Sequence, residues 1–178
     1  MEYFILKQDQ RLINTAQPQQ VSRLLPPELL LPERHGALDD MNLYFTVQKG
    51  GLMEPTDYIQ HPVPLMSDAM RKLLILWEPS IRSYPVTLND TELIEHKLYW
   101  LVLPPLVQAL AEETSFYPDG SLKQLVLNNE QLRNYTVCQL AGIRERIILV
   151  NLGLAESILR RDYDGICLER IGASAQVY

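Results

Sequence analysis

The sequence predicts an α+β fold, with a mixed, mostly antiparallel sheet and two principal amphipathic helices packed on it, at about residues 67–77 and 152–161. Three observations support this prediction. Apolar residues recur at spacings of three and four in these two segments, as in a helix that buries one face. Several short runs are rich in aromatic and β-branched residues, which is typical of strands. Clusters of Gly, Pro, Asn and Asp separate the runs and indicate turns.

The composition of the chain limits the classes of protein to which it can belong. With 178 residues, of which 47% are hydrophobic, the chain can bury a sizeable core, and we expect a single domain over residues 1–178. The formal net charge of −6 disfavours non-specific binding to nucleic acid, because phosphate contacts need clustered Lys and Arg. The N-terminus lacks the basic region of a signal peptide, and prolines interrupt the longest apolar stretch, 98–111. We therefore expect a cytoplasmic monomer or homodimer that binds neither nucleic acid nor membranes.

The N-terminal third begins with a predicted short strand, Tyr3–Lys7. Residues 14–40 hold four of the twelve prolines and show no clear period, which predicts a proline-rich, irregular connection with room for one short strand at 21–25. Residues 43–48 are rich in aromatic and β-branched side chains and predict a strand, which ends in a turn at Gly50–Gly51.

The first principal helix has a clear start and a clear end. Residues 62–66 are predicted to be extended, because each proline disfavours a helical conformation at the residue before it. Ser67 is a good N-cap, and Asp68 places a negative charge where the helix dipole is positive. Apolar residues then follow at helical spacing up to Trp77, and Pro79 ends the helix.

Residues 81–88 predict a strand that Pro85 restricts to an edge or a bulge, followed by a turn at Asn89–Asp90. Residues 96–103 are apolar on both faces, with Leu98, Trp100 and Val102 on one of them, which predicts a central strand. Residues 106–113 predict a short helix.

The C-terminal part alternates strands, turns and helices. Asn151 is the predicted N-cap of the second principal helix, and the arginines at 160–161 suit its C-terminal end. The tail, 172–178, is expected to be frayed. The remaining predictions are a turn at 117–120, a strand at 122–127, a helical turn at 128–133, a hairpin of 136–140 with 146–150, a turn at Asp164–Gly165 and a last strand at 166–171.

The residues that most often carry chemistry do not form a recognisable site. His35, His61 and His96 are far apart and lack metal-ligand spacing, so we predict no metal site. Cys138 and Cys167 lie in apolar runs without a Cys-x-x-Cys spacing, and we predict that both are buried thiols in a reducing compartment.

Other candidates have simpler explanations. The role of Ser67 as a helix cap explains it without a nucleophile motif, and Gly50–Gly51 lacks the lysine and helix of a phosphate-binding loop. The adjacent acidic pairs Asp39–Asp40 and Glu112–Glu113 are typical of a solvated surface, because acid–base catalysis needs carboxyl groups in unlike environments. We therefore predict no catalytic or cofactor-binding residues, no cofactor, and no enzyme activity.

Three segments together resemble a known family: the opening Met1–Lys7, the central Val63–Leu74 and the closing Leu154–Ile166. They are similar to the Myxococcus-type immunity proteins of bacterial polymorphic-toxin systems, whose pattern is a first strand with a lysine, a Ser-capped helix after a short strand, and a last helix that leads into a Gly-containing turn and strand. The resemblance covers nearly the full length, and residues 14–40 are more elaborate than the family pattern.

This resemblance implies a non-enzymatic protein that binds and neutralises a cognate bacterial toxin by steric blocking. It identifies no partner-binding residue. Two alternatives stay open from the sequence. One is a hydrolase-like enzyme with a dispersed site, which a pocket of converging Ser, His and acidic residues would favour. The other is a scaffold or regulatory binding module, which higher oligomers would favour.

Overall fold

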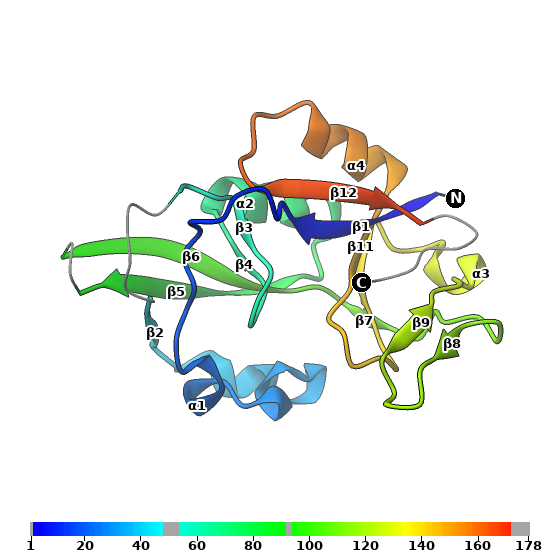
Figure 1. Cartoon of the computed structure of the whole chain (residues 1–178), viewed down its shortest axis with the longest axis horizontal. Coiled ribbons are helices and arrows are strands. Elements are labelled where there is room, and N and C mark those ends of the chain that lie inside the picture. Colours follow the sequence, from blue (N-terminus) through cyan, green and yellow to red (C-terminus); the bar gives the residue numbers. More distant parts are fainter. Residues whose placement is uncertain (1, 48–53, 92–93, 172–178) are drawn as a thin grey trace. The chain divides into compact units, whose positions relative to one another are not determined.

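The computed structural model describes residues 2–47, 54–91 and 94–171. The chain divides into two compact units: unit 1 comprises Met1–Lys7, Pro104–Asp162 and Cys167–Tyr178, and unit 2 comprises Gln8–Leu103 and Tyr163–Ile166. Each unit has strands and helices, so the α+β class is confirmed, with two five-stranded sheets in place of the single sheet that we predicted (Figure 1). That the chain is one domain stays a prediction.

Unit 2 is built on a five-stranded sheet with the strand order β2-β5-β6-β4-β3. Only the β2–β5 pair is parallel, and the other three pairs are antiparallel. The strands are β2 (Leu43–Thr46), β3 (Tyr58–Ile59), β4 (Leu65–Met66), β5 (Arg82–Asp90) and β6 (Glu95–Leu103). The central position of β6 is confirmed, because strands pair with both of its sides.

Two different groups of helices cover the two faces of this sheet. On one face, Phe45, Val86 and Leu101 form a core with residues of three short helices, α1 (Val21–Leu24), η1 (Pro27–Leu30) and η2 (Pro32–Leu38). The core is completed by further buried side chains of the same segments and strands, including Val21, Leu25, Leu38, Leu43, Leu88 and Tyr99. On the other face lies α2 (Asp68–Trp77), so that β5 and β6 run between the two helical layers (Figure 1).

Helix α2 forms as its sequence predicts. The Ser67 hydroxyl accepts a hydrogen bond from the backbone N–H of Met70 at 3.2 Å, which confirms the N-cap. Ion pairs with Lys72 and Arg71 lower the pKa of Asp68 in the first turn. The Arg71 guanidinium also lies over the Trp100 ring, 3.9 Å from its centroid, which links α2 to β6.

Unit 1 contains a second sheet with the strand order β12-β1-β11-β10-β7. Its strands are β1 (Tyr3–Gln8), β7 (Leu106–Val107), β10 (Val137–Leu140), β11 (Ile148–Asn151) and β12 (Ile166–Arg170). The predicted hairpin of β10 with β11 is confirmed, and so is the Asn151 cap of helix α4 (Leu152–Leu159), whose side chain accepts from Leu154 N–H at 2.9 Å. The unit also has the β8–β9 hairpin (Ser115–Phe116 and Leu122–Gln124) and the helical turn α3 (Asn129–Leu132).

Several local predictions were wrong because packing against, or pairing with, segments distant in sequence outweighed local propensity. The segment predicted as a strand at 21–25 forms helix α1, and the connection 14–40 holds three short helices in place of an irregular path. The segment predicted as a helix at 106–113 contains strand β7, which pairs in parallel with β10. Its buried residues Val107 and Ala109 alternate with exposed neighbours, which is the period of a strand.

The two wrong predictions in β5 concern its place in the sheet and its length. Strand β5 lies inside the sheet although it contains Pro85. The carbonyl of Asn89 accepts a hydrogen bond from Val47 N–H and so points toward β2. Backbone groups alternate along a strand, so the nitrogen of Pro85 points toward β2 as well. The pairing with β2 begins only at Val86, however, so the missing N–H of Pro85 breaks no hydrogen bond between β2 and β5. The predicted turn at Asn89–Asp90 is also wrong, since both residues continue the pairing with β6.

The predictions for the two cysteines had different outcomes. Cys138 is buried as expected, whereas Cys167 is exposed, because it lies on β12 at the edge of its sheet. The turn at Gly50–Gly51 and the frayed tail 172–178 lie outside the described residues.

The Tyr3 side chain anchors β1 within unit 1. Its hydroxyl donates to the carbonyl oxygens of Leu132 and Tyr135, and burial raises the pKa of the phenol to about 12, with a smaller effect of Cys138. We predict that Tyr3→Phe lowers the free energy of unfolding by about 1–2 kcal/mol, because it leaves buried carbonyl groups without this donor. Urea denaturation measures the change, and an unchanged unfolding midpoint would contradict it.

Gly165 lies where no side chain fits. It has a φ of +71°, and a Cβ atom at this position would lie 2.1 Å from the Thr56 hydroxyl oxygen. We predict that Gly165→Ala destabilises the protein by roughly 2 kcal/mol or more, through both the positive φ and the clash. Gly36→Ala is the matched control, because a Cβ atom at Gly36 meets nothing within 4 Å. Equal melting temperatures of the two variants would show that the close approach to Thr56 is unimportant.

Candidate binding surface

The candidates from the sequence lie apart in the structure, in structural or exposed positions. Ser67 caps α2, and His35 contacts the carbonyl of Leu30 through Nε2 at 3.1 Å. The acidic pairs at 39–40 and 112–113 are exposed, as predicted. Within residues 2–47, 54–91 and 94–171, no three His, Cys, Asp or Glu side chains are grouped so that they could hold a metal ion.

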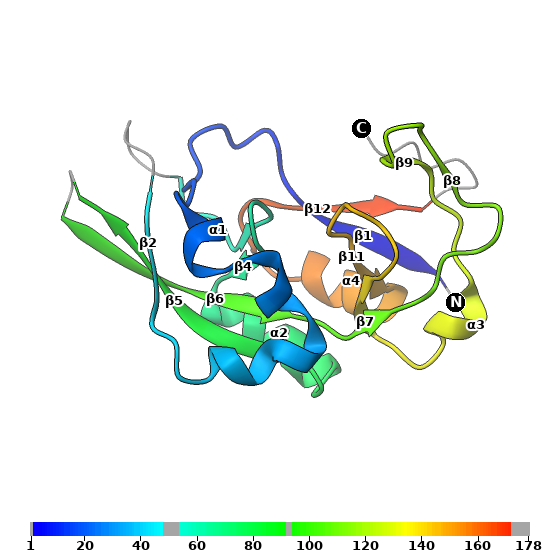
Figure 2. The same ribbon diagram turned by 90° about the horizontal axis from the view of Figure 1, so that it is seen from below.

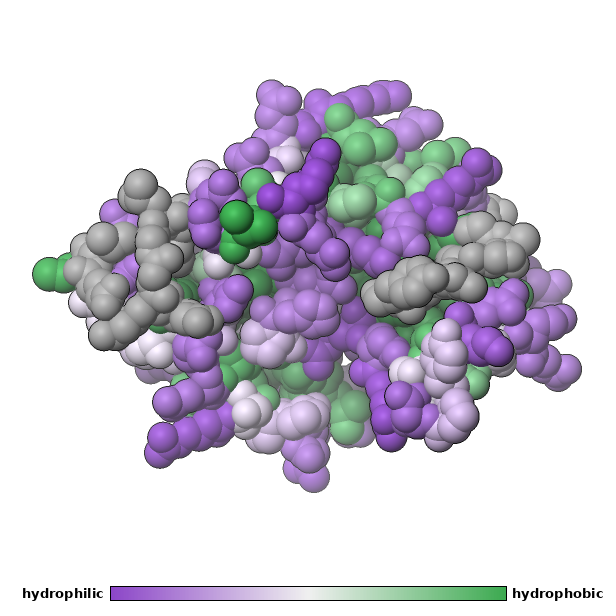
Figure 3. Space-filling model, viewed as in Figure 1, coloured by the Kyte–Doolittle hydropathy of each residue, from purple (hydrophilic) through white to green (hydrophobic). Residues whose placement is uncertain are grey.

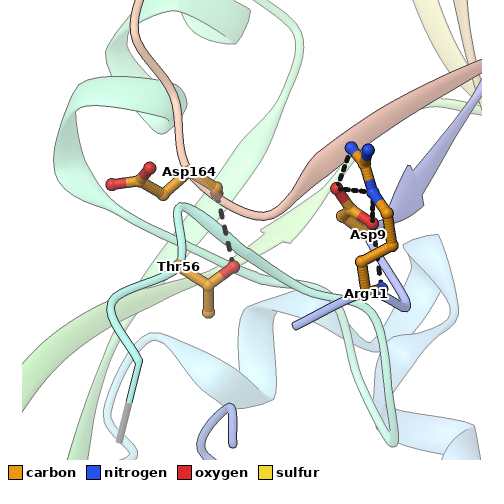
Figure 4. Close-up of polar contacts among 4 residues, drawn as sticks. All are labelled: Asp9, Arg11, Thr56 and Asp164. Carbon is orange, nitrogen blue, oxygen red and sulfur yellow. Dashed lines mark hydrogen bonds and ion pairs between the residues drawn. The ribbon is translucent and has the colours of Figure 1, made fainter. Parts of the chain in front are cut away.

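One group of polar side chains that the structure brings together lies in unit 2, around Thr56 and Asp164. Thr56 is 5% exposed, and its hydroxyl donates to the carbonyls of Tyr58 at 3.0 Å and of Asp164 at 3.4 Å. Asp164 and Asp57 are joined through the Asp57 carboxylate, which accepts from Asp164 N–H at 2.8 Å. These bonds hold the turn at Asp164–Gly165, which confirms that prediction. Figure 4 shows that the Asp164 carboxylate points away from Thr56, so the two do not converge on a reacting atom.

A different feature of unit 2 has the character of a binding site. One half of the sheet face that α2 covers is left open, and we call it the open sheet face. It consists of two rows that cross three strands in register: Tyr44–Thr87–Leu98, and Thr46–Asn89–His96. The outer members of both rows are exposed, whereas Thr87 is half-buried and Asn89 is buried. The turn end of the β5–β6 hairpin, where these rows lie, extends beyond α2 in both views (Figures 1 and 2).

The exposure of the side chains follows the cover that α2 provides. Along β6, Leu98, Trp100 and Val102 share this face, as predicted; Leu98 is 58% exposed, whereas Val102 is fully buried. The Trp100 ring between them lies under Arg71 of α2. Tyr44 is 45% exposed, and its hydroxyl accepts a hydrogen bond from the Asn89 side-chain amide. This bond fixes the position of an aromatic ring on the open sheet face.

The six side chains of the open sheet face have the composition of a protein interface. None is Lys, Arg, Asp or Glu, and the face combines a tyrosine and a leucine with two threonines, an asparagine and a histidine. The centres of protein interfaces are likewise depleted of charge and enriched in tyrosine. On the side of the molecule seen in Figure 3, hydrophilic residues predominate and hydrophobic ones form separate groups.

The charges of the chain are distributed unequally between the two units. Unit 2 holds 13 acidic and 8 basic residues, whereas unit 1 holds 9 and 8, so unit 2 carries a formal charge of −5 out of the total of −6. The acidic field therefore surrounds the unit that presents the open sheet face. Such a field raises the rate at which a basic partner reaches the surface.

Each unit also has a cavity at its surface. In unit 2, a cavity of about 310 Å³ lies beside β2, between the α1 residues Arg23 and Leu24 and the strand residues Tyr44 and Phe45. In unit 1, a cavity of about 520 Å³ lies between β7 and α3 and is lined mainly by polar side chains, among them Gln108, Gln131 and Asn134. Sequence reasoning identified neither cavity. The strand alternation at 43–46 and 96–99 was the one signal that could have indicated Tyr44 and Leu98 as outward-facing.

No protein-family profile matches the chain, and no curated protein sequence matches it. The resemblance to immunity proteins thus stays a prediction. In the described residues, every helix is too short or too polar to cross a lipid bilayer.

The ion pair of Asp9 with Arg11 gives a pH-dependent prediction (Figure 4). Hydrogen bonds from the Arg11 side chain and backbone lower the pKa of the Asp9 carboxyl to about 2. A lowered pKa in the folded state means that the stabilising contribution is complete above the unfolded pKa of about 3.9 and is lost as the pH falls toward 2. We expect an NMR titration to find the Asp9 midpoint near pH 2. In Arg11→Ala the midpoint should rise toward the ordinary value; equal midpoints would contradict the assignment.

Proposed function

We propose that this chain is a non-enzymatic immunity protein that binds a cognate bacterial toxin in the cytoplasm and blocks it sterically. The observation that carries the proposal is the open sheet face, with Tyr44 held by Asn89 and with Leu98 exposed in the adjacent row. A sheet is a rigid platform, so a partner that packs on it loses little free energy to ordering of the platform. The similarity of three segments to immunity proteins supplies the class of partner.

The way in which the polar residues are used supports a binder. Ser67, Asn151 and Asn128 cap helices, and Thr56, Asp57 and Asp9 hold turns and loop crossings in unit 2. Each of these side chains thus has a structural role. The acidic character of unit 2 supports a basic toxin, such as a nuclease, as the partner, because opposite charges speed association.

The proposal predicts that the chain protects cells from the toxin encoded beside it. Co-expression should relieve growth arrest, and the two proteins should elute together on gel filtration. Unrelieved arrest together with separate elution of two folded proteins would overturn the proposal. A protein that protects by destroying the toxin would instead leave no stoichiometric complex.

A pair of leucine variants tests whether the open sheet face is the contact. Leu98→Glu places a charge on the open sheet face at its most exposed apolar side chain, and we expect it to weaken toxin binding about thirtyfold or more, as for a hot-spot residue worth about 2 kcal/mol. Leu76→Glu is the matched control, since Leu76 is 77% exposed on α2 and lies outside the face. Titration calorimetry measures both affinities. Equal affinities of the two variants would place the contact elsewhere on the protein.

A further inference from the structure

The backbone of β2 presents hydrogen-bonding groups at the outer edge of the unit 2 sheet. β2 is the first strand in the sheet order, so one of its sides has no neighbouring strand. The N–H of Val47 donates to Asn89 on β5, whereas the carbonyl of Thr46 accepts from Gln19 N–H on the opposite side, at 2.8 Å. Backbone groups alternate along a strand, so the N–H and C=O of Tyr44 point to the same outer side as those of Thr46.

Among the described residues, the chain covers one end of this edge. Pro18 forms an antiparallel bridge with Val47, and Gln19 binds Thr46. At Gln20 the backbone adopts a φ of 54°, and the chain turns away into helix α1. Within the part of the chain that the structure describes, no segment continues the pairing at Tyr44. The edge therefore pairs with an extended segment at Thr46. Tyr44, the next residue whose backbone groups point outward, has no pairing partner among the described residues.

The cavity beside β2 begins where this pairing stops. It lies between α1 and the strand, with Leu24 and Phe45 providing apolar walls and Arg23 and Gln20 at its polar margin. Leu24 is 43% exposed. An extended segment that continued the pairing would place every second side chain toward one face, so one apolar side chain could enter this cavity.

We propose that an extended segment of the toxin adds to the outer edge of β2 as a further strand, with its backbone bound to the N–H and C=O of Tyr44. This inference rests on the proposed function and specifies how the partner docks. The outward N–H and C=O of Tyr44 can form the same pair of hydrogen bonds with the backbone of an added strand that neighbouring strands of a sheet form with each other. The edge is also continuous with the open sheet face, because the Tyr44 side chain belongs to that face while its backbone forms the edge.

Amide hydrogen exchange tests the pairing at single residues. In the free protein, the Tyr44 N–H should exchange rapidly because it points outward, whereas the Phe45 N–H, which points toward β5, should exchange slowly. With the toxin bound, the exchange of Tyr44 should slow about tenfold or more, with little change at Phe45. If wild-type protein binds the toxin and Tyr44 exchanges as fast as before, the strand addition is overturned.

Two substitutions at the same position separate the backbone from the side chain. Tyr44→Ala and Tyr44→Pro both remove the phenol, but only the proline removes the outward N–H, at an edge position where proline is tolerated. We expect the proline variant to bind the toxin about tenfold more weakly than the alanine variant, which corresponds to one hydrogen bond. Equal affinities would overturn the strand addition and leave the proposed function intact. Absence of toxin binding by the wild-type chain would overturn the proposed function itself.

Discussion

The pairing of β5 with β6 is the constraint on which unit 2 depends. Nine residues of each strand are in register, from Arg82 opposite Leu103 to Asp90 opposite Glu95. Because side chains alternate along a strand, this single register decides which residues face α1, η1 and η2 and which face α2. A shift of one strand by one residue would turn its buried side chains, Val86 and Leu88 on β5 or Tyr99 and Leu101 on β6, out of the core of the unit and toward the opposite face of the sheet. The burial of these core side chains therefore also fixes which side chains lie on the opposite face of the sheet, where α2 and the open sheet face are.

The same register explains why a binding surface exists on this sheet. Helix α2 has only ten residues and covers the part of the face around Trp100. The strands continue beyond it, so the rows of Tyr44 and Leu98 are left open. Burial of Leu98 would contribute about 1–2 kcal/mol. The fold does not gain this free energy, so a partner that covers Leu98 gains it on binding. The open face thus results from the short length of α2, whereas the uncovered edge of β2 results from the turn of the chain at Gln20 into α1.

The polar residues of the chain show how local chemistry and packing divide their roles. Ser67 and Asn151 satisfy the backbone N–H groups at the starts of α2 and α4, which are local bonds three residues apart. Thr56 and Asp57 instead bind residues more than a hundred positions away, at 164, and Gly165 is needed there because Thr56 lies so close. The first kind of contact can be predicted from the spacing of residues in the sequence. The second kind depends on where the turn at Asp164–Gly165 meets the residues that lead into β3.

The sequence by itself determined the class of the fold, both principal helices with their caps, the β10–β11 hairpin and the central place of β6. These features depend on periodicity and on contacts within a few residues, which a sequence displays directly. Tertiary structure decided the division into two sheets, the inward position of β5 despite Pro85, the short helices of residues 21–38, and the strand at Leu106–Val107. It also decided the open sheet face, since Tyr44, Thr87 and Leu98 come from three strands and become neighbours only through register. The physical reason is that the exposure of a residue depends on which element covers it. Helix α2 is too short to cover the full length of β5 and β6, and this difference matters only once the unit is assembled.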